Sequence, residues 1–447
     1  MHRRDFLKYS GLALAPPLVA ADSEKADHTL RIAPVSLEIG PGKTIKTTGY
    51  NGSVPGPVMR FTEGKPVTID VYNDTDMPEV VHWHGFRIPS AVDGSMEEGT
   101  PEIPPHGHAR YRFTPRPAGT RWYHTHIMAH ADLTRAGFSG QFGFAIVEPA
   151  RHAGNYDQEF LIAAHHWEPS LAHMGPPDNG WEIAYKSATL NSKMLGAAEP
   201  LRVREGQRVL FRLLNTSATD EIRLALPGHK FQVIALDGNP VAKPQMVDYV
   251  YLDIAERIDA IVEMNNPGVW VLGSTKDDER TMGMGVVVEY ANKSGEPQWK
   301  GPLGVGRGPW DYSIFGSGRP AAKPDHEITL KFGKIPGKRV DFNRWTINGK
   351  GFPENETIRL EKGKRYRLNF DNTDTGDIHP LHLHRHTFEI VQAGDKPMAG
   401  IMKDTISVAR KSTAAVDFVA DNPGMTLFHC HMQLHMDYGF MQLFDYA

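Results

Sequence analysis

Four pairs of histidines, each with one residue between its members, stand out in this chain of 447 residues. On a β-strand, residues two positions apart point to the same face, so each pair would present two imidazoles side by side. Imidazole is a common metal ligand, and a set of imidazoles without carboxylates suits several copper ions. We therefore expect one shared pool of metal ligands, formed by His82 and His84, His124 and His126, His382 and His384, and His429 and His431.

Strand parity leaves a second set of candidate ligands. Cys430, the only cysteine, lies between the two histidines of the last pair and would point to the opposite face. His379 has the opposite parity to the pair that follows it, and His435 comes shortly after the last pair. One thiolate with two imidazoles is the ligand set of a blue-copper electron-transfer centre. Zinc sites more often carry several cysteines, or three ligands that include a carboxylate.

A unit that recurs three times along the chain would position these ligands. In each copy a Gly and an Asn stand nine residues apart, with an alternating apolar strand between them: Gly64 and Asn73, Gly206 and Asn215, Gly363 and Asn372. This period-two pattern, bounded by turn residues, is typical of a half-buried strand. Each copy closes with Pro and Gly before a last strand. That strand carries a histidine pair in the first and third copies but Gly273-Ser-Thr275 in the second, which we interpret as a copper-free spacer.

The repeats predict the domain organisation. The chain is too long for one ordinary domain, and dense turn signals with little helical periodicity favour β-sandwiches. A segment rich in Gly, Pro, Lys and Ser separates the second and third copies. We expect domains at residues 29–150, 155–293 and 326–447, with a linker at 294–325.

Charge and the N-terminus bear on location and partners. The net charge of −4 and the sequence pI of about 6.6 call for neither a nucleic acid nor an anionic membrane as partner. Residues 1–21 read as a twin-arginine export signal, because Arg3 and Arg4 precede an apolar stretch and small residues that suit cleavage. That stretch is too short to span a membrane as a mature helix. We therefore expect a periplasmic or otherwise exported protein, with no membrane attachment after cleavage.

The ligand signatures, taken in order, resemble those of the multicopper oxidases, which include laccases, cuprous oxidases and ascorbate oxidases. The likeness covers nearly the whole chain after the signal, and His429-Cys430-His431 with His435 four residues on is its most specific motif. The resemblance implies an all-β chain of three cupredoxin-like Greek-key β-sandwich domains. It also implies about four copper ions per chain, of which one is type 1, one type 2 and two type 3.

The same resemblance assigns a role to each ligand. His82 and His382 match the type 2 ligands, and His379, Cys430 and His435 match the type 1 ligands. A reductant would lose single electrons to type 1 copper through His435, which we expect to be exposed. Cys430 would pass the electrons to its covalent neighbours. Four such electrons would reduce one O2. The matches to the type 3 pair are His84, His124, His126, His384, His429 and His431.

The reducing substrate is the open point. We favour a laccase-like oxidase of phenols and aromatic amines, because the 17 methionines are scattered rather than gathered as in cuprous oxidases. The alternatives are a cuprous or metal-ion oxidase in copper tolerance and, as a non-enzyme, a copper carrier or storage protein. A two-domain nitrite reductase would lack the histidine pool, and a cupin would explain neither Cys430 nor the repeats. The segment 166–189 is a candidate wall of the substrate pocket, or else a plain surface loop.

One acidic residue and several further histidines are weaker candidates. Asp93 follows the first histidine strand, where relatives carry an acid that faces the cluster, and it could relay protons to the oxygen site. An Asp93-Gly94 turn without such a role is the equal alternative. His386 is expected to be structural, because the second copy keeps His229 at the matching place although it lacks ligands. For His165 and His166 we also expect structural roles.

The residue on the axis of type 1 copper is predicted from the end of the motif. In the family this residue follows the Gly that closes the run after the last ligand, which is Phe440 here. An aromatic ring cannot donate to copper, so its presence would favour Cu(I) and raise the reduction potential. A shift of one residue would place Met441 there instead.

Overall fold

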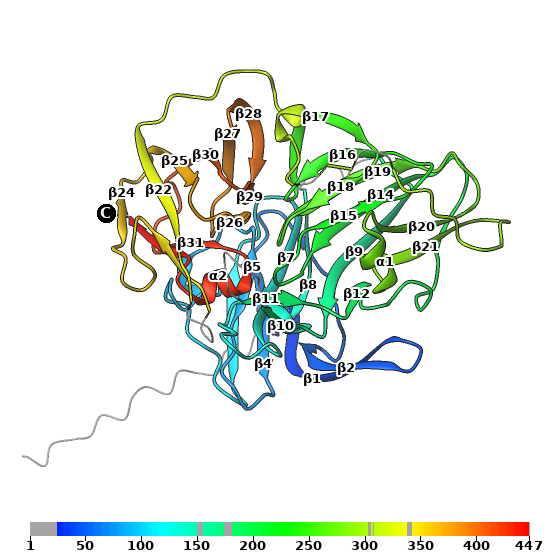
Figure 1. Cartoon of the computed structure of the whole chain (residues 1–447). Helices are drawn as coiled ribbons and strands as arrows, with labels where there is room; N and C mark the ends of the chain where they lie inside the picture. The colour runs from blue at the N-terminus through cyan, green and yellow to red at the C-terminus, as the bar shows by residue number, and fades with distance from the viewer. Residues whose placement is uncertain are drawn as a thin grey trace, which may run out of the picture.

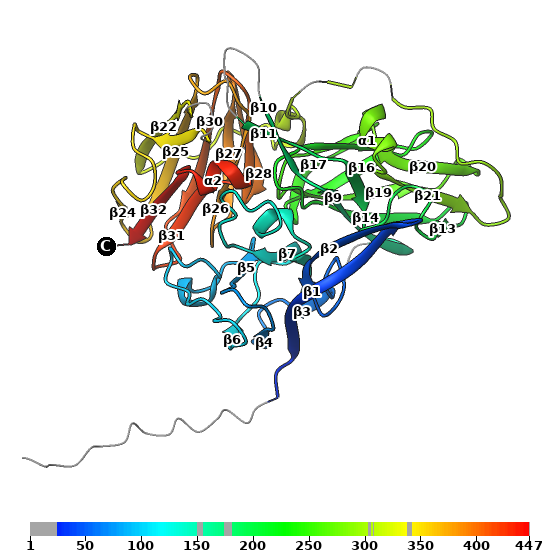
Figure 2. The same cartoon turned by 60° about the horizontal axis from the view of Figure 1, so that its bottom comes forward.

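The computed structural model describes residues 25–149, 155–173, 181–302, 305–306, 308–337 and 342–446. The predicted export signal, residues 1–21, lies outside these ranges and stays a prediction. None of the described helices has the length and apolar character that crossing a membrane requires. The described strands fall into three regions, residues 25–149, 155–293 and 326–446, and Figures 1 and 2 show the second region (green) and the third (yellow to red) side by side, with the first (blue to cyan) against both.

The first region consists of two four-stranded sheets and two short 3-10 helices, η1 (Ser90–Val92) and η2 (Ala136–Phe138). One sheet has the order β2 (Lys43–Tyr50), β1 (His28–Gly40), β4 (Val67–Asn73) and β6 (His108–Phe113). The other has the order β3 (Met59–Thr62), β8 (Phe142–Glu148), β7 (Gly119–Thr125) and β5 (Val81–His84).

The second region consists of a six-stranded sheet, a five-stranded sheet, a hairpin and helix α1 (Asp277–Thr281). The hairpin is formed by β10 (Ser170–His173) and β11 (Trp181–Ala184). The six-stranded sheet has the order β12 (Ser187–Leu190), β9 (Gln158–Trp167), β14 (Arg208–Asn215), β19 (Arg257–Glu263), β16 (Phe231–Leu236) and β17 (Asn239–Val247). The five-stranded sheet has the order β13 (Leu201–Val203), β21 (Gly285–Tyr290), β20 (Val269–Ser274), β15 (Ile222–Ala225) and β18 (Val250–Leu252).

The third region repeats this plan of six and five strands and contains helix α2 (Gln433–Asp437). A short 3-10 helix, η3 (Tyr312–Phe315), lies in the segment before it. The six-stranded sheet has the order β23 (Arg344–Ile347), β22 (His326–Ile335), β25 (Arg365–Asn372), β30 (Ser412–Val419), β27 (Phe388–Ala393) and β28 (Lys396–Lys403). The five-stranded sheet has the order β24 (Ile358–Leu360), β32 (Met441–Tyr446), β31 (Thr426–Cys430), β26 (His379–Leu383) and β29 (Thr405–Val408).

The repeated Gly and Asn have the same structural role in all three regions. Each Gly has a positive φ, at which a side chain would be strained: 78° at Gly64, 82° at Gly206 and 83° at Gly363. Each strand that follows pairs in parallel with the first long strand of its region. Each Asn at its end is fully buried and donates its side-chain amide to backbone carbonyls of the neighbouring loops. The all-β prediction is confirmed, whereas the predicted domain boundaries stay a prediction.

A buried ion network forms where the three regions meet. Arg257 of β19 donates two hydrogen bonds of 2.6 Å to Asp404, which lies between β28 and β29. Arg121 of β7 donates to the same carboxylate at 3.3 Å, and all three side chains are fully buried. Burial lowers the pKa of Arg121 to about 10, against the opposing pull of Asp404, so it stays charged at neutral pH. Gly85 leaves the necessary room, because a Cβ there would lie 2.6 Å from the Arg257 guanidinium.

We expect Arg257→Met to destabilise the protein strongly. The substitution leaves the Asp404 carboxylate without its two shortest hydrogen bonds in the interior, and breaking a buried pair in this way costs about 3–5 kcal/mol. Chemical denaturation of the metal-free protein measures the loss. The matched control is Arg202→Met, whose side chain pairs with Glu289 but is 68% exposed, so that its loss should be about 1 kcal/mol or less. Equal losses in the two variants would contradict the importance of the network.

Candidate metal centre

Two strand pairs bring the histidine pool together. In the first region β5 pairs with β7, so that His82 lies opposite His124. In the third region β26 pairs with β31, so that His382 lies opposite His429. The two regions then face each other. The ring of His84 stacks on that of His382 with centroids 3.7 Å apart, and the eight imidazoles form one pool between the first and third regions.

Within the pool, three sets of ring nitrogens lie close enough to share a metal ion, with every ligand atom within 4.8 Å of the others in its set. Adjacent sets would hold ions side by side, as a polynuclear site requires. The sets contain His126, His384 and His429; His84, His124 and His431; and His82, His84 and His382.

Several of these nitrogens lack any partner in the protein. The Nε2 atoms of His82, His382 and His431 are buried without a hydrogen bond, which is costly unless another group satisfies them. Burial, together with the neighbouring imidazoles, lowers the pKa of His382 and His431 well below the usual value. These rings are therefore neutral and have free lone pairs, which fits a metal ion.

The opposite nitrogens of the rings donate to oxygen atoms that hold each ring in place. His382 Nδ1 lies 2.7 Å from the backbone oxygen of Asp404, and His84 Nε2 lies 3.1 Å from the Asp404 carboxylate. These contacts fix the tautomers, so that His382 presents Nε2 and His84 presents Nδ1 to the pool. Such outer partners orient metal ligands and raise their basicity. Asp404, and Arg257 behind it, were not identified from the sequence, because no local motif marks them.

Asp93 also contacts the pool. Its carboxylate lies 2.9 Å from His384 Nδ1 and 3.1 Å from His82 Nδ1. Asp93 also closes the short helix η1, where its backbone N–H donates to the Ser90 oxygen, and Gly94 follows with a positive φ of 96°. The structure thus places Asp93 both at a turn and at the pool, and its role as a proton relay stays a prediction. The sequence did not reveal Glu98, a buried carboxyl group 3.7 Å from His384 Nδ1.

The second predicted set lies on the other face of β31. The Cys430 Sγ atom is 3.7 Å from His379 Nδ1 and 3.4 Å from His435 Nδ1. Thr375 Oγ1 lies 2.8 Å from His379 Nε2 and so leaves Nδ1 free for a ligand bond. Burial raises the pKa of the Cys430 thiol well above its usual value when no cation is present. A soft cation that stabilised the thiolate would fit this site.

Phe440, rather than Met441, packs against the ligands of this second set. The ring centroid of Phe440 lies 4.7 Å from that of His379, and Phe440 packs in the same core cluster as Cys430. Met441 lies opposite His429 in β32 and packs in a separate cluster with Leu427. Strand alternation thus turns the thioether away from the thiol.

The histidines expected to be structural lie outside the ligand sets. The His386 ring bonds to the Tyr446 hydroxyl and to the backbone oxygen of His384. His165 Nδ1 donates to the backbone oxygen of Thr216, and His166 Nδ1 contacts a serine hydroxyl. His386 thus has partners for both ring nitrogens, whereas the Nε2 atoms of His165 and His166 are buried without one. The structural role of these three residues stays a prediction.

A cavity of about 240 Å³ adjoins His435, which is only partly exposed, less than expected from the sequence. The ring of Trp345 lies over His435, with the two centroids 3.9 Å apart. Of the segment 166–189, Trp181 lines the cavity, whereas Trp167 is buried in the core and residues 174–180 lie outside the described ranges. The aromatic lining is formed by Trp181, Phe342, Trp345 and Tyr438, and the acidic lining by Glu182, Asp220, Glu221 and Asp377.

Comparisons with known proteins cover most of the chain. Three models of multicopper oxidase domains match residues 32–152, 138–292 and 324–447. The chain is 30% identical to the multicopper oxidase MmcO of Mycobacterium tuberculosis over 94% of this chain and 86% of that protein. It is 26% identical to Laccase-3 of Thanatephorus cucumeris over 90% of this chain and 87% of that protein.

Solved structures share the fold. A multi-copper oxidase from Pseudomonas thermotolerans superimposes with a TM-score of 0.73 at 27% identity, over 95% of this chain and all of that chain. Fet3p, a multicopper oxidase that functions in iron import, superimposes with a TM-score of 0.81 at 21% identity, over 94% of this chain and 90% of that chain.

We expect Cys430→Ser to abolish the intense blue absorption, because only this thiolate can give a charge-transfer band with copper. The histidine pool lies on the other face of the strand and should stay loaded, so that copper content falls only from about four to about three ions per chain. Absorption spectroscopy and metal analysis check the two parts separately. Persistent blue colour in the variant would refute the assignment of Cys430.

The packing of Phe440 also predicts the effect of two substitutions on the type 1 reduction potential. Phe440→Met brings a thioether to the thiol site, where it donates weakly and favours Cu(II), so the potential should fall. Met441→Leu is the control, because this side chain packs elsewhere, and the potential should barely change. Redox titration of the blue absorption measures both, and the reverse pattern would identify Met441 as the axial ligand.

Proposed function

Because this chain belongs to the multicopper oxidase family, we propose that it couples the one-electron oxidation of phenols and aromatic amines to the reduction of O2 to water. The family makes the protein a copper-containing oxidoreductase. The proposal adds the assignment of the ligands to type 1, type 2 and type 3 copper, and the class of reductant. Export, expected from residues 1–21, is part of the same proposal.

The observation that carries the proposal is the position of Cys430 between the two ligand sets. His429 and His431, its covalent neighbours, belong to two different sets of the histidine pool, while its thiol lies beside His379 and His435. Bound copper would supply the one-electron redox chemistry. The chain supplies a covalent path between the two sites, fixes the tautomers of the rings and keeps the pool buried. A copper carrier or storage protein would need no second pool joined to the thiol in this way.

The cavity beside His435 supports an aromatic reductant. Trp345 and Tyr438 are among its walls, and aromatic side chains stack well on aromatic rings. Two of its carboxylates are neutralised, since Asp377 pairs with Lys334 at 2.9 Å and Glu221 pairs with Arg223 at 2.7 Å.

Asp220 gives this cavity a group that can accept a proton. Burial and, to a lesser extent, the neighbouring Glu221 raise its pKa to about 6. Removal of one electron from a phenol releases its hydroxyl proton, so a carboxylate at this place would assist the reaction. Above a pH of about 6 the group is ionised and can accept this proton.

A metal-ion oxidase is the second candidate function. Its support is the carboxylate lining of the same cavity, because Glu182 and Asp220 could bind a divalent cation through oxygen ligands. For Cu(I), a soft ion, the cavity offers the thioether of Met432. Similar proteins include laccases. Among the solved structures, a metallo-oxidase from Campylobacter jejuni superimposes with a TM-score of 0.72 at 20% identity, over 94% of this chain and 91% of that chain.

Steady-state rates with a phenol and with Cu(I) under air test the proposal and its alternative. We expect a higher kcat/KM for the phenol, and we expect it to fall as the pH is lowered through about 6, because Asp220 becomes protonated. In Asp220→Asn this dependence should vanish, and the rate at pH 7 should drop about tenfold, within the range of general base catalysis. Asp395→Asn, at an exposed position, is the control and should behave as the wild type. A higher kcat/KM for Cu(I) would favour the metal-ion oxidase.

A further inference from the structure

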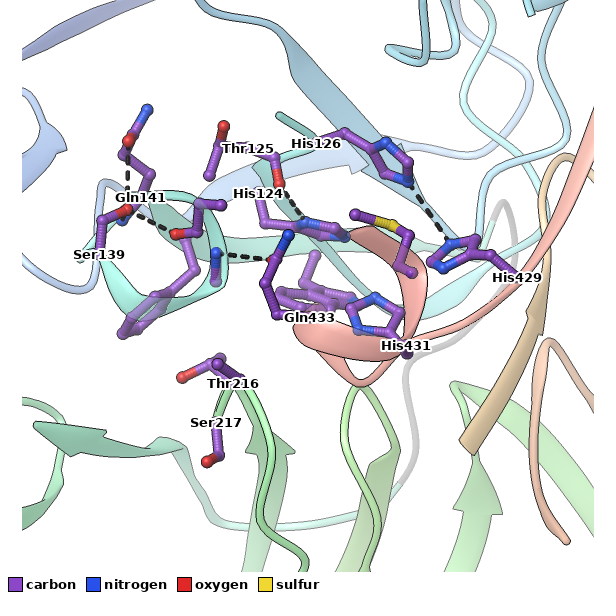
Figure 3. A pocket seen from close by; sticks show the side chains of 16 residues that line it. His124, Thr125, His126, Ser139, Gln141, Thr216, Ser217, His429, His431 and Gln433 are labelled. Atoms are coloured by element: carbon purple, nitrogen blue, oxygen red, sulfur yellow. Dashed lines mark hydrogen bonds between the residues drawn. The ribbon is translucent and has the colours of Figure 1, made fainter. Parts of the chain in front are cut away.

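A small cavity lies beside the histidine pool, and Figure 3 shows the polar side chains of its wall. His124 and His126 of the first region and His429 and His431 of the third line it, and Gln433 of α2 joins them. Its water-accessible volume is about 30 Å³, which is room for about two water molecules. The cavity therefore allows water to approach this side of the pool.

Behind the wall lies a buried carboxyl group, Glu79, which is only 3% exposed. The Thr125 hydroxyl donates to Glu79 Oε2 at 3.1 Å, and the Gln141 amide donates to the same oxygen at 2.9 Å. Thr125 and Gln141 both line the cavity. A hydroxyl group and an amide group of two wall residues thus contact the carboxyl group.

The charge environment of Glu79 differs from that of the structural carboxylates. Within the described part of the chain it forms no ion pair, whereas Asp404 has two arginines. Burial raises the pKa of Glu79, whereas its two hydrogen bonds and, more weakly, Arg135 lower it. Tyr50 is its other titratable neighbour. A carboxyl group buried without a cation costs stability. Such groups gather at functional sites, where a proton must be held and released.

We propose that Glu79 delivers protons to the oxygen-reducing pool through the Thr125 hydroxyl and the water-sized cavity. The inference rests on the proposed function, in which O2 takes up four electrons from the reductant and four protons to give two molecules of water. When Glu79 is protonated, the hydrogen bond to Thr125 reverses: the carboxyl group gives its proton to the Thr125 oxygen, while the hydroxyl proton of Thr125 passes to water in the cavity and on to the pool. The carboxylate takes a new proton from bulk water near Asp76 and Met77, which are exposed just before it in the chain.

This route is distinct from the one predicted for Asp93. Asp93 contacts His82 and His384, and neither of these rings lines the cavity. Glu79 therefore serves other rings of the pool than Asp93 does. Met436, on the α2 wall of the cavity, has no proton to give.

Rapid mixing of the copper-loaded protein tests the proposal by separating its two half-reactions. In Glu79→Gln we expect the anaerobic bleaching of the blue band by substrate, and the copper content, to match the wild type. Reoxidation by O2 should slow about tenfold, and its solvent deuterium isotope effect should increase. The slowing is smaller than the loss of a single proton donor would cause, because Asp93 remains. Glu79→Asp, which keeps a carboxyl group, should lie between, and Glu199→Gln, at an exposed position, is the control.

A second measurement does not depend on copper. Infrared difference spectra between the metal-free wild type and Glu79→Gln should contain the band of a protonated carboxyl group, with a titration midpoint above the value of about 4.3 for an ordinary glutamate. A midpoint at or below that value would overturn the proposal.

Three further outcomes are decisive. If Glu79→Gln were reoxidised at the wild-type rate with an unchanged isotope effect, the proposal would be overturned. The activity of the wild type would still support the oxidase function in that case. If the wild type itself consumed no O2 with any reductant, the proposed function would fail first, and this inference with it. If Glu79→Gln lost copper or failed to fold, Thr125→Val would decide, because it removes only the hydroxyl group and should slow reoxidation in the same way. Normal reoxidation in Thr125→Val would then overturn the route.

Discussion

The burial of the Asp404 carboxylate is the constraint on which the rest of the site depends. Removing a carboxylate from water costs several kcal/mol, and only well-placed cations and hydrogen bonds recover this loss. Arg257 comes from the second region, Arg121 from the first and Asp404 from the third, so the pairing is complete only when all three regions are docked. The same carboxylate then holds His84, and its backbone oxygen holds His382. The second region, although it lacks copper ligands, is therefore more than the spacer suggested by its sequence.

A second constraint is the alternation of a β-strand. On β31, Cys430 points to one face and its two neighbours to the other, so one short strand serves two sites without any loop between them. The same alternation separates Phe440, beside the thiol, from Met441, which packs away from it. A slip of one residue in this sheet would exchange the faces and remove both sites at once. The ligands accordingly lie on paired strands or at the first residue after them, except His435, which lies on α2.

The sequence predicted what depends on local spacing. His82 and His84, or Cys430 between its two histidines, reveal their geometry through strand parity alone, and the recurring Gly and Asn reveal the repeated fold. It did not predict Asp404, Arg257 or Glu79, because each acquires its role from partners in distant parts of the chain. Asp404 follows Lys403 between two strands, in a context that resembles many turns, and only docking places Arg257 beside it. The cavity beside His435 was predicted only in part, because the segment 166–189 contributes Trp181 while β23 and α2, which no local pattern connects with it, form other walls.

The distribution of charge around the pool links these features to catalysis. Burial lowers the pKa of ligand rings such as His382 and His431, so these rings are neutral in the folded protein. Bound copper ions would therefore bring uncompensated positive charge into the interior. Asp93 and Asp404 lie within hydrogen-bonding distance of the rings and can offset that charge. Glu79 stands one hydroxyl group further back, and among the described residues it forms no ion pair that would keep it ionised. The interior thus holds carboxyl groups in two settings: Asp93 and Asp404 contact the histidine rings and hold them in place, whereas Glu79, which forms no ion pair among the described residues, is the group we propose to exchange its proton.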